Sequence, residues 1–297
     1  MNRLLEICGP TATGKTDLGV YLAEKLNGEI ISADSRQVYR GMTIGTGKEY
    51  SDTAKIWGYD LAQPTDEFSV AHFQKFAHKK ISEILSHGKL PILVGGTGLY
   101  IRAILENIDT TAIPPNELLR AELETKSVEE LFTKLHELNP QKALSLNESD
   151  KQNPRRLIRA LEIAMSNKQT TVKPILYDSL IVGLKSDMSY LENRLKMSIE
   201  KRMARGMVKE VTDLLHAGVP LESKAMTATG YREIALFILG KLSEEEATQK
   251  WLLSERRYVK RQLTWFNKRT DIHWFDIAKA HYKYEVEEVV KKWENKP

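Results

Sequence analysis

A phosphate-binding motif near the start of the chain constrains the fold more than any other feature. The stretch fits the pattern G-x-x-x-x-G-K-[ST], and its residues are Gly9, Pro10, Thr11, Ala12, Thr13, Gly14, Lys15 and Thr16. An apolar run at 4–8 precedes it, and residues 17–26 follow with apolar positions at helical spacing. In a strand, loop and helix of this kind, backbone N–H groups and the helix N-terminus hold phosphates. Lys15 adds a full positive charge and the Thr16 hydroxyl can ligate Mg²⁺, so the motif predicts a di- or triphosphate site.

Composition indicates a soluble protein with one large domain or two modest ones. The 297 residues are 41% hydrophobic and 28% charged, and no apolar run reaches membrane-spanning length. The first residues predict a strand rather than a signal peptide. The single cysteine, Cys8, excludes an internal disulfide and is typical of a reducing compartment. A net charge of +4 permits an anionic partner without requiring one. We therefore expect a cytoplasmic protein with no membrane contact.

Two further strand candidates end in polar or glycine-rich segments at the edge where the phosphate loop lies. Residues 30–31 form the first candidate, and Asp34 follows it. Residues 90–94 form the second, and a glycine turn at 95–100 presents the Thr97 hydroxyl. Ligands of open parallel sheets bind at the carboxyl ends of the strands. Asp34 is therefore predicted to be a Mg²⁺ ligand or a base, with a helix N-cap as the structural alternative.

The segment between these two strands is predicted to contain a loop and a helix. Residues 40–48 are glycine-rich and include two cations, and we expect this loop to close over the ligand edge of the sheet. Residues 68–87 have apolar positions at helical spacing, and Gly88 ends that helix.

The middle of the chain lacks strand candidates and predicts an inserted helical domain. Helical patterns occupy 117–126, 128–137 and 154–167. We predict an α/β core of residues 1–109 and 178–297, with a helical insertion of residues 110–177. Three arginines lie within about one turn of the last helix, so they cannot all be buried. They predict a nucleic-acid contact or a solvated basic face, and they are Arg155, Arg156 and Arg159.

The last third of the chain combines two predicted strands with strongly basic helices. Strand patterns return at 179–184 and 273–276, and residues 284–293 predict a closing helix. A very basic helical pattern covers 191–216, and a polar glycine turn follows at 227–232. The helix from Ser243 to about Asn267 combines aromatic residues with the cations Arg256, Arg257, Lys260 and Arg261. Cations beside aromatic rings are typical of an RNA-binding surface, and a solvated helix face is the alternative.

These stretches together resemble the bacterial tRNA dimethylallyltransferases from end to end. The resemblance rests on 9–16, on the block SADSRQVYRGM at 32–42 and on GGTGLY at 95–100. The basic stretches RRLIRALE at 155–162 and KRQLTWF at 260–266 follow at suitable distances. The block at 32–42 is the specific part, because many kinases share the phosphate loop.

The family resemblance implies a reaction and a fold. Dimethylallyl diphosphate donates its five-carbon group to the exocyclic N6 amine of the adenosine 3′ of the anticodon, and diphosphate leaves. The implied fold is α/β, a P-loop NTPase-like parallel sheet flanked by helices with an inserted all-helical domain. The implied cofactor is Mg²⁺, the implied partner is the tRNA anticodon stem-loop, and we expect a monomer.

The resemblance also assigns roles to individual residues. Asp34 would be the general base on the adenine amine, Thr97 would support the site, and Thr16 would hold the metal. The residues assigned to tRNA contact are Asp34, Ser35, Arg36, Gln37, Thr97, Arg120, Arg155, Arg156, Arg159, Thr227, Gly230, Tyr231, Arg232, Arg256, Lys260 and Arg261.

Two departures from the family pattern are evident. The family has a Pro-His-His-Leu segment where this chain has KIWG at 55–58. The family also has an arginine on the long basic helix that touches the diphosphate. Counting back from Gly206 places Ser198 there, with Arg194 and Arg202 one turn to either side. We predict that Arg202 serves as this catalytic arginine.

Three other functions use some of the same features. A small-molecule kinase would explain the phosphate loop and Asp34, but not the helical insertion or the basic aromatic helix. An adenylate isopentenyltransferase, which uses a free nucleotide as acceptor, would not need the extra basic surface. The third function is that of a non-catalytic RNA-binding ATPase.

Overall fold

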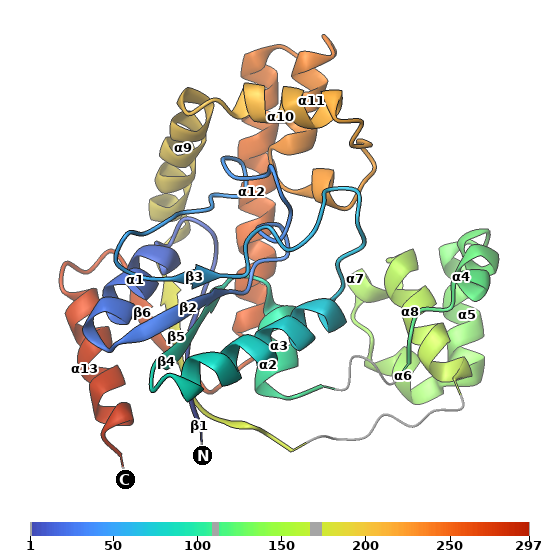
Figure 1. The fold of residues 1–297 in the computed structure, drawn as a ribbon. Coiled ribbons are helices and arrows are strands. Elements are labelled where there is room, and N and C mark those ends of the chain that lie inside the picture. Colours follow the sequence, from blue (N-terminus) through green and yellow to red (C-terminus); the bar gives the residue numbers. More distant parts are fainter. Residues whose placement is uncertain (1, 109–112, 167–173, 297) are drawn as a thin grey trace. The chain divides into compact units, whose positions relative to one another are not determined.

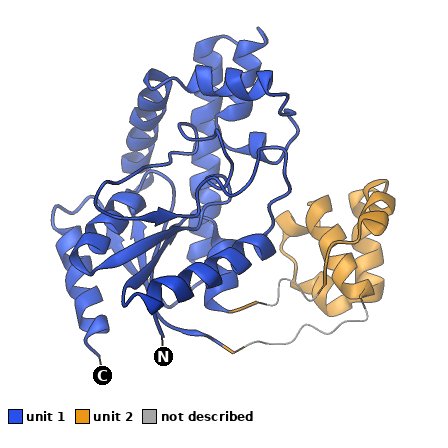
Figure 2. Cartoon of the chain, viewed as in Figure 1, with its two compact units in different colours: residues 1–106, 175–297 blue, residues 107–174 orange. Residues whose placement is uncertain are grey.

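The computed structural model describes residues 2–108, 113–166 and 174–296 and contains two compact units (Figure 2). One unit comprises the chain up to residue 106 and from 175 onward, and the other comprises residues 107–174. The predicted end of a helix at Asn167 and the predicted domain boundary at 109–110 fall outside the described residues. No helix among the described residues combines the length and the apolar character needed to cross a membrane.

The larger unit is built on a six-stranded, all-parallel sheet in the order β3-β2-β4-β1-β5-β6 (Figure 1). Its strands are β1 (Asn2–Cys8), β2 (Gly28–Ser32), β3 (Ile56–Trp57), β4 (Leu90–Gly95), β5 (Tyr177–Lys185) and β6 (Ile272–Asp276). The central strand β1 alternates between two apolar layers: Leu5 and Ile7 face one, and Leu4 and Cys8 face the other. A parallel sheet needs cover on both faces, which explains its continuous apolar strands.

Helices cover both faces of this sheet (Figure 1). Buried residues of α1 (Lys15–Lys25), α9 (Met188–Ala204) and α13 (Tyr282–Glu294) join Leu5 and Ile7. Buried residues of α2 (Val70–Ser86), α3 (Gly98–Leu105), α10 (Met207–His216) and α11 (Tyr231–Ile238) join Leu4 and Cys8. The long helix α12 (Glu244–Phe266) contributes Trp251 and Phe266 to the second layer and Val259 to the first.

Most helices and strands of the larger unit lie where the local sequence patterns predicted them. All the predicted strands form, and Ser243 caps α12 through a reciprocal hydrogen-bond pair with Glu246. The single helix expected at 191–216 is wrong. Gly206 adopts φ 99°, a left-handed conformation that favours glycine, and it separates α9 from α10. The KIWG segment forms the short edge strand β3, which sequence reasoning missed.

The smaller unit is helical among its described residues, as expected. Its elements are α4 (Glu117–Glu124), α5 (Val128–Leu138), α6 (Pro140–Ser145), α7 (Glu148–Lys151) and α8 (Pro154–Met165). Leucines of α4, α5 and α8 form its apolar core, including Leu123, Leu131 and Leu157. Asn153 caps α8 by accepting a hydrogen bond from the Arg156 N–H, and Pro154 occupies the first turn. The short helices α6 and α7 were not predicted.

Candidate active site

The phosphate loop joins β1 to α1 in the predicted arrangement. Gly9 has φ 136°, and a Cβ there would lie 2.4 Å from the Leu184 carbonyl oxygen, so a side chain is excluded. Gly14 has φ 79° and directly precedes α1. The Thr13 hydroxyl donates to the Pro10 carbonyl at 2.8 Å and closes the turn. These contacts curl the loop around the N-terminus of α1, where backbone N–H groups are free to bind an anion.

Lys15 lies in the first turn of α1 and is half-buried. Its Nζ donates to the Pro10 carbonyl oxygen at 2.6 Å. Burial lowers the pKa of Lys15 to about 8, while the nearby Asp34 carboxylate acts in the opposite direction. A bound phosphate would favour the protonated form, so ligand binding and protonation of this amine are coupled.

The phosphate loop forms one wall of a cavity of about 660 Å³. Cationic residues line one part of it: Lys15, Arg194, Lys201, Arg202 and Arg205. Another set of lining residues is apolar or aromatic: Ile30, Ile44, Ile56, Tyr59, Val94 and Tyr258. The cavity therefore offers charge for a diphosphate together with apolar surface for a short hydrocarbon. Ile56 belongs to the segment that departs from the family pattern, so this segment contributes to the cavity wall.

A smaller cavity of about 140 Å³ adjoins the first. This smaller cavity, and not the larger one, is lined by Ser35, Arg36, Thr227 and Arg261. Residues that line both cavities mark where they meet, and these are Thr11, Asp34, Thr46, Arg202 and Tyr258. Asp34 thus lies between a space suited to a diphosphate ester and a space suited to one nucleobase.

Asp34 follows β2 and combines a local structural role with a free oxygen. Its Oδ1 accepts hydrogen bonds from the backbone N–H groups of Arg36 at 2.7 Å and Gln37 at 3.4 Å. These bonds close a turn at residues 34–37, and no helix follows there, so the predicted alternative of a helix N-cap is wrong. Within the described part of the chain, no hydrogen bond to Oδ2 is found, so one carboxylate oxygen remains available for chemistry.

The glycine turn after β4 supports Asp34 from the next strand. The Thr97 hydroxyl oxygen accepts a hydrogen bond from the Ser35 N–H at 3.0 Å, which fixes the turn that carries Asp34. Close packing accounts for two glycines of this turn. A Cβ on Gly95 would lie 2.2 Å from the Ala33 carbonyl oxygen, and one on Gly98 would lie 2.3 Å from the Trp265 ring. Close packing within the protein therefore requires glycine at both positions, independently of any contact with a ligand.

Gln262, which sequence reasoning did not select as a site residue, links the two loops. Its Oε1 accepts from the Thr11 N–H at 2.9 Å, and its Nε2 donates to the Gly96 carbonyl at 3.0 Å. The side chain is 5% exposed. A polar residue on the buried face of α12 was the available signal, but its partners lie far away in sequence.

Two arginines of α9 reach the larger cavity. Arg194 donates from Nε to the Ala12 carbonyl oxygen at 2.6 Å, so it contacts the phosphate loop directly. Arg202 donates from Nη1 to Glu255 Oε1 at 3.1 Å, and its guanidinium lies 5.9 Å from the Trp251 ring centroid. Ser198 lies between them and lines the same cavity. Both arginines are thus candidates for contact with a diphosphate, and Arg194 is the one bonded to the loop.

Glu255 is a second unpredicted residue of the site. Its Oε1 accepts from Arg202, from the Thr229 hydroxyl at 2.9 Å and from the Trp251 indole N–H at 3.2 Å. Its Oε2 is buried and finds no partner among the described residues, although Glu255 lines the smaller cavity. Arg36 Nη1 is likewise buried without a partner there, while Arg36 Nη2 donates to Thr227 at 2.9 Å. The smaller cavity is therefore lined by residues that retain one unused acceptor and one unused donor.

Several residues assigned to tRNA contact have other partners in the core. Gln37 is buried and bonds to Ser32 and to the backbone of residues 46–47. Tyr231 is buried, and its hydroxyl donates to Glu210 at 2.6 Å. A Cβ on Gly230 would lie 2.3 Å from the Trp251 ring. Arg232, Lys260 and Arg261 are exposed, and Arg256 forms an ion pair with Glu192 at 3.4 Å.

In the helical unit, the arginines that were predicted to contact tRNA differ in the protein groups that they bind. Arg120 and Arg159 both bind the buried carboxylate of Glu162, at 2.8 and 3.0 Å. Arg156 pairs with Asp150, and Arg155 is exposed. Burial raises the pKa of Glu162, but hydrogen bonds from Arg120, the Asn116 N–H and Arg159 outweigh it and hold that pKa below its usual value.

Comparison with known proteins identifies the family. A model of the IPP transferase family matches residues 37–269. The chain belongs to the IPP transferase family. A curated tRNA dimethylallyltransferase of Bacillus anthracis is 39% identical over 294 residues, covering 94% of this chain and 92% of that protein. A Bacillus cereus tRNA dimethylallyltransferase matches to the same extent.

Solved structures agree with this family assignment. A tRNA isopentenylpyrophosphate transferase of Bacillus halodurans is 35% identical with a TM-score of 0.75, covering 98% of this chain and 96% of that one. Its Staphylococcus epidermidis counterpart is 32% identical with a TM-score of 0.73 over 99% of both chains. A eukaryotic dimethylallyltransferase is 23% identical with a TM-score of 0.85, covering 100% of this chain and 81% of that one, and shares the fold. The predicted α/β fold class is thereby confirmed.

Proposed function

We propose that this protein transfers a dimethylallyl group from dimethylallyl diphosphate to N6 of the adenosine 3′ of the anticodon in tRNA, and releases diphosphate. The observation that carries this proposal is the meeting of two cavities at Asp34. One has a phosphate loop, cations and apolar surface, and the other has the size and polar lining for a nucleobase. The names of the relatives support the same reaction. The substrates suit a cytoplasmic protein.

In the proposed mechanism, the diphosphate of the donor lies on the N–H groups of the phosphate loop and on Lys15. Arg194 and Arg202 face the same cavity and would stabilise the charge that develops on the leaving diphosphate. The apolar surface, which includes Ile56 and Tyr59, would receive the five-carbon group. This arrangement would hold both halves of the donor in one cavity.

The acceptor adenine must leave the base stack to enter the smaller cavity. Arg36 Nη1 can donate to a ring nitrogen, and Glu255 Oε2 can accept from an N–H group. The N6 lone pair then attacks the allylic carbon of the donor, and the carbon–oxygen bond to diphosphate breaks with its electron pair. Asp34 Oδ2 accepts the proton that N6 loses, so charge and atoms balance. Thr97 keeps Asp34 in place through Ser35.

The residues present fit a Mg²⁺ ion held mainly by the substrate. Among the described residues there is no group of three or more His, Cys, Asp or Glu side chains that could form a metal cage. Mg²⁺ commonly binds one or two protein oxygens together with substrate phosphates. Thr16 lines the larger cavity and would supply such an oxygen. When bound, the ion would add positive charge to the leaving diphosphate.

We further propose that the helical insertion and the exposed cations of α12 bind tRNA. Arg155 in the insertion, and Lys260 and Arg261 on α12, are exposed. The guanidinium of Arg261 lies 5.5 Å from the Tyr258 ring centroid, and both residues line the smaller cavity. Phosphate contacts of this kind position a nucleic acid without reading its sequence.

Isotope transfer tests the proposed function and separates it from competing functions. Labelled dimethylallyl diphosphate is incubated with the protein and either an anticodon stem-loop or AMP, and the product is digested and mapped. We expect label on N6 of the adenosine 3′ of the anticodon. A stem-loop with guanosine at that position is the matched control and should stay unlabelled.

Three results would contradict the proposal, two of them from parallel incubations to which ATP is added. Label on AMP alone would identify an adenylate isopentenyltransferase. Phosphoryl transfer from ATP to a small molecule, without label transfer, would identify a kinase. ATP hydrolysis in the presence of RNA, again without label transfer, would identify an RNA-binding ATPase.

A further inference from the structure

The loop at residues 43–47 forms part of the junction between the two cavities. It contains neither helix nor strand. Thr46 lines both cavities, Ile44 and Gly47 line the larger one, and Gly45 lines the smaller one. The position of this backbone therefore affects how closely a donor in one cavity can approach an acceptor in the other.

Side-chain packing restrains this loop unevenly: Gly45 is buried against the Tyr231 ring and the Met207 side chain, whereas Ile44 is less enclosed. A third cavity, of about 590 Å³, lies against it and is lined by Ile44, Arg40, Arg205 and Leu214 among others. Ile44 thus borders two different cavities and is only partly buried. Since dispersion contacts are lost wherever a side chain faces empty space or solvent, polar contacts must supply much of the restraint.

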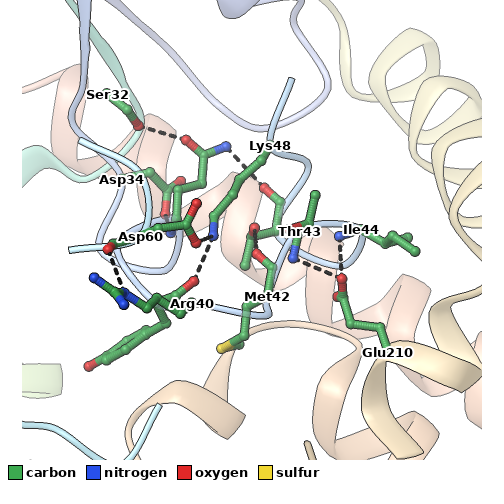
Figure 3. Close-up of polar contacts among 12 residues, drawn as sticks. Ser32, Asp34, Arg40, Met42, Thr43, Ile44, Lys48, Asp60 and Glu210 are labelled. Atoms are coloured by element: carbon green, nitrogen blue, oxygen red, sulfur yellow. Dashed lines mark hydrogen bonds and ion pairs between the residues drawn. The ribbon is translucent and has the colours of Figure 1, made fainter. Parts of the chain in front are cut away.

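Glu210, on α10, supplies three of these polar contacts. Its Oε2 accepts from the backbone N–H groups of Thr43 at 2.8 Å and Ile44 at 2.7 Å. Its Oε1 accepts from the Gly45 N–H at 3.0 Å and from the Tyr231 hydroxyl at 2.6 Å. In Figure 3 the carboxylate of Glu210 faces the backbone of Thr43 and Ile44. Three successive N–H groups are thereby bound by one carboxylate, in charge-assisted hydrogen bonds.

Gln37 connects the other end of the loop to the strand that carries Asp34. Its Nε2 donates to the carbonyl oxygens of Thr46 at 3.1 Å and Gly47 at 3.2 Å. Its Oε1 accepts from the hydroxyl of Ser32, the last residue of β2, at 2.6 Å. The loop is therefore fixed between α10 and the C-terminal end of β2, two residues before Asp34.

Lys48 continues this network at the end of the loop (Figure 3). It is 1% exposed, and its Nζ donates to the Tyr39 carbonyl at 2.6 Å and to Asp60 Oδ1 at 2.7 Å. This cation of the loop thus joins two parts of the connection between β2 and α2. Glu210 remains the side chain that binds the N–H groups of residues 43–45.

We propose that Glu210 is a positioning residue for the transfer reaction. By binding the N–H groups of residues 43–45, it holds the junction of the two cavities at the width that aligns donor carbon and acceptor amine beside Asp34. The inference rests on the proposed function. Because Glu210 is absent from the lining of both substrate cavities, its loss should affect alignment more than the binding of either substrate.

A graded set of variants tests this inference by single-turnover transfer to a saturating stem-loop. Glu210→Ala removes all four acceptor contacts and should lower the transfer rate about 100-fold, the scale of a 1 Å misplacement. Glu210→Gln keeps one accepting oxygen and should lower the rate about 10-fold. Tyr231→Phe removes the hydroxyl contacts with Glu210 and with the Thr46 backbone, keeps the three N–H contacts of Glu210, and should change the rate less than about threefold. Asp213→Asn, which removes an exposed carboxylate from the same helix, is the matched control.

Donor and stem-loop affinities and the thermal unfolding midpoint are measured for the same proteins. The inference predicts affinities within about threefold of wild type and fully folded variants at the assay temperature. A rate of Glu210→Gln equal to that of Tyr231→Phe would overturn it. The inference would also be overturned if weaker substrate binding, or the fraction of unfolded protein, accounted for the whole loss of rate. If the wild-type protein transfers no label, the proposed function itself fails, which is a separate outcome.

Discussion

Two buried glutamates, each bound by arginine, have different surroundings in the two units. Glu162 of the helical unit uses both carboxylate oxygens: Oε1 binds Arg120 and the Asn116 N–H, and Oε2 binds Arg120 and Arg159. Glu255 of the α/β core directs three donors to Oε1, while Oε2 lacks a partner among the described residues. Both carboxylate oxygens of Glu162 are hydrogen-bonded. Glu255 lines the smaller cavity, and its Oε2 can still accept a hydrogen bond.

This difference shows that a count of cations in a sequence does not tell which of them already have carboxylate partners in the fold. Arg120 and Arg159 were predicted to contact tRNA, and the structure shows both bound to Glu162. Arg202 is also bound to a glutamate, but it lines both cavities. The Glu255 cluster differs in two ways: one carboxylate oxygen has no partner among the described residues, and a cavity lies beside it. We propose that these two features distinguish a cluster that binds ligand from one that stabilises the fold.

The largest expected effect concerns stability in the helical unit. Glu162→Ala should lower the free energy of unfolding by about 3 kcal/mol, the low end for a broken buried pair, because both arginines reach solvent. Glu148→Ala, which removes an exposed carboxylate in the same unit, should change it by less than about 0.5 kcal/mol. Denaturant unfolding measures both. Equal stabilities of the two variants would contradict the structural role of the Glu162 cluster.

The protonation of Glu162 gives this stability a pH dependence. Its pKa is lowered in the folded protein, so its contribution is complete above the unfolded value and is lost as pH falls through the folded value. The difference in stability between wild type and Glu162→Ala should therefore shrink under acid conditions and stay constant near neutrality.

The next largest effect concerns donor binding in the core. Lys15→Ala should remove a charge-assisted contact worth about 1.5–3 kcal/mol, which weakens affinity for dimethylallyl diphosphate roughly 10- to 150-fold. Lys25→Ala, at the other end of α1, is the matched control and should bind normally. Equilibrium binding of labelled donor checks both variants. Unchanged affinity of Lys15→Ala would show that the loop does not hold the diphosphate.

The same lysine should give donor binding a distinctive pH profile. With a pKa of about 8 in the free protein, Lys15 is mostly protonated at pH 7 and loses its charge above pH 8. Binding of the anion favours the protonated amine, so affinity should be flat below pH 8 and fall up to about tenfold per unit above it. A profile that stays flat to pH 10 would mean that burial does not perturb this amine.

The smallest effect concerns the salt dependence of tRNA binding. Arg155→Gln should reduce the slope of log affinity against log salt by about 0.7–0.9, as expected for one phosphate contact. Arg159→Gln should reduce it less, because Glu162 already binds that guanidinium. Titration of tRNA at several salt concentrations gives the slopes. An equal reduction for both arginines would remove the distinction drawn from the two glutamates.

The sequence predicted the parts of the site that local patterns encode. The phosphate loop, Asp34 at the end of β2 and Thr97 after β4 follow from strand and glycine signals within about ten residues. The contacts of the α9 arginines did not follow from the sequence, because 194, 198 and 202 are spaced by four residues and share one face of α9. Helical periodicity brings all three positions to the cavity, and only tertiary structure shows that Arg194 touches the loop.

The residues that sequence reasoning missed are buried polar groups with distant partners. Gln262, Glu255 and Glu210 each bind groups that are at least 20 residues away in sequence. A buried polar side chain must find hydrogen-bond partners, but the sequence does not show which partners the fold brings near. The short strand β3 was missed for a related reason, since two residues give no measurable alternation.

The most direct test of the proposed mechanism is the single-turnover rate of Asp34→Asn with a saturating stem-loop, with donor affinity measured separately. Asparagine keeps the shape and can still accept the backbone hydrogen bonds, but it cannot take the N6 proton. We expect the rate to fall roughly 10²- to 10⁴-fold while donor affinity stays within about threefold of wild type. A near-normal rate would contradict the role of Asp34 as base. A loss of donor affinity with a raised Mg²⁺ requirement would make Asp34 a metal ligand instead.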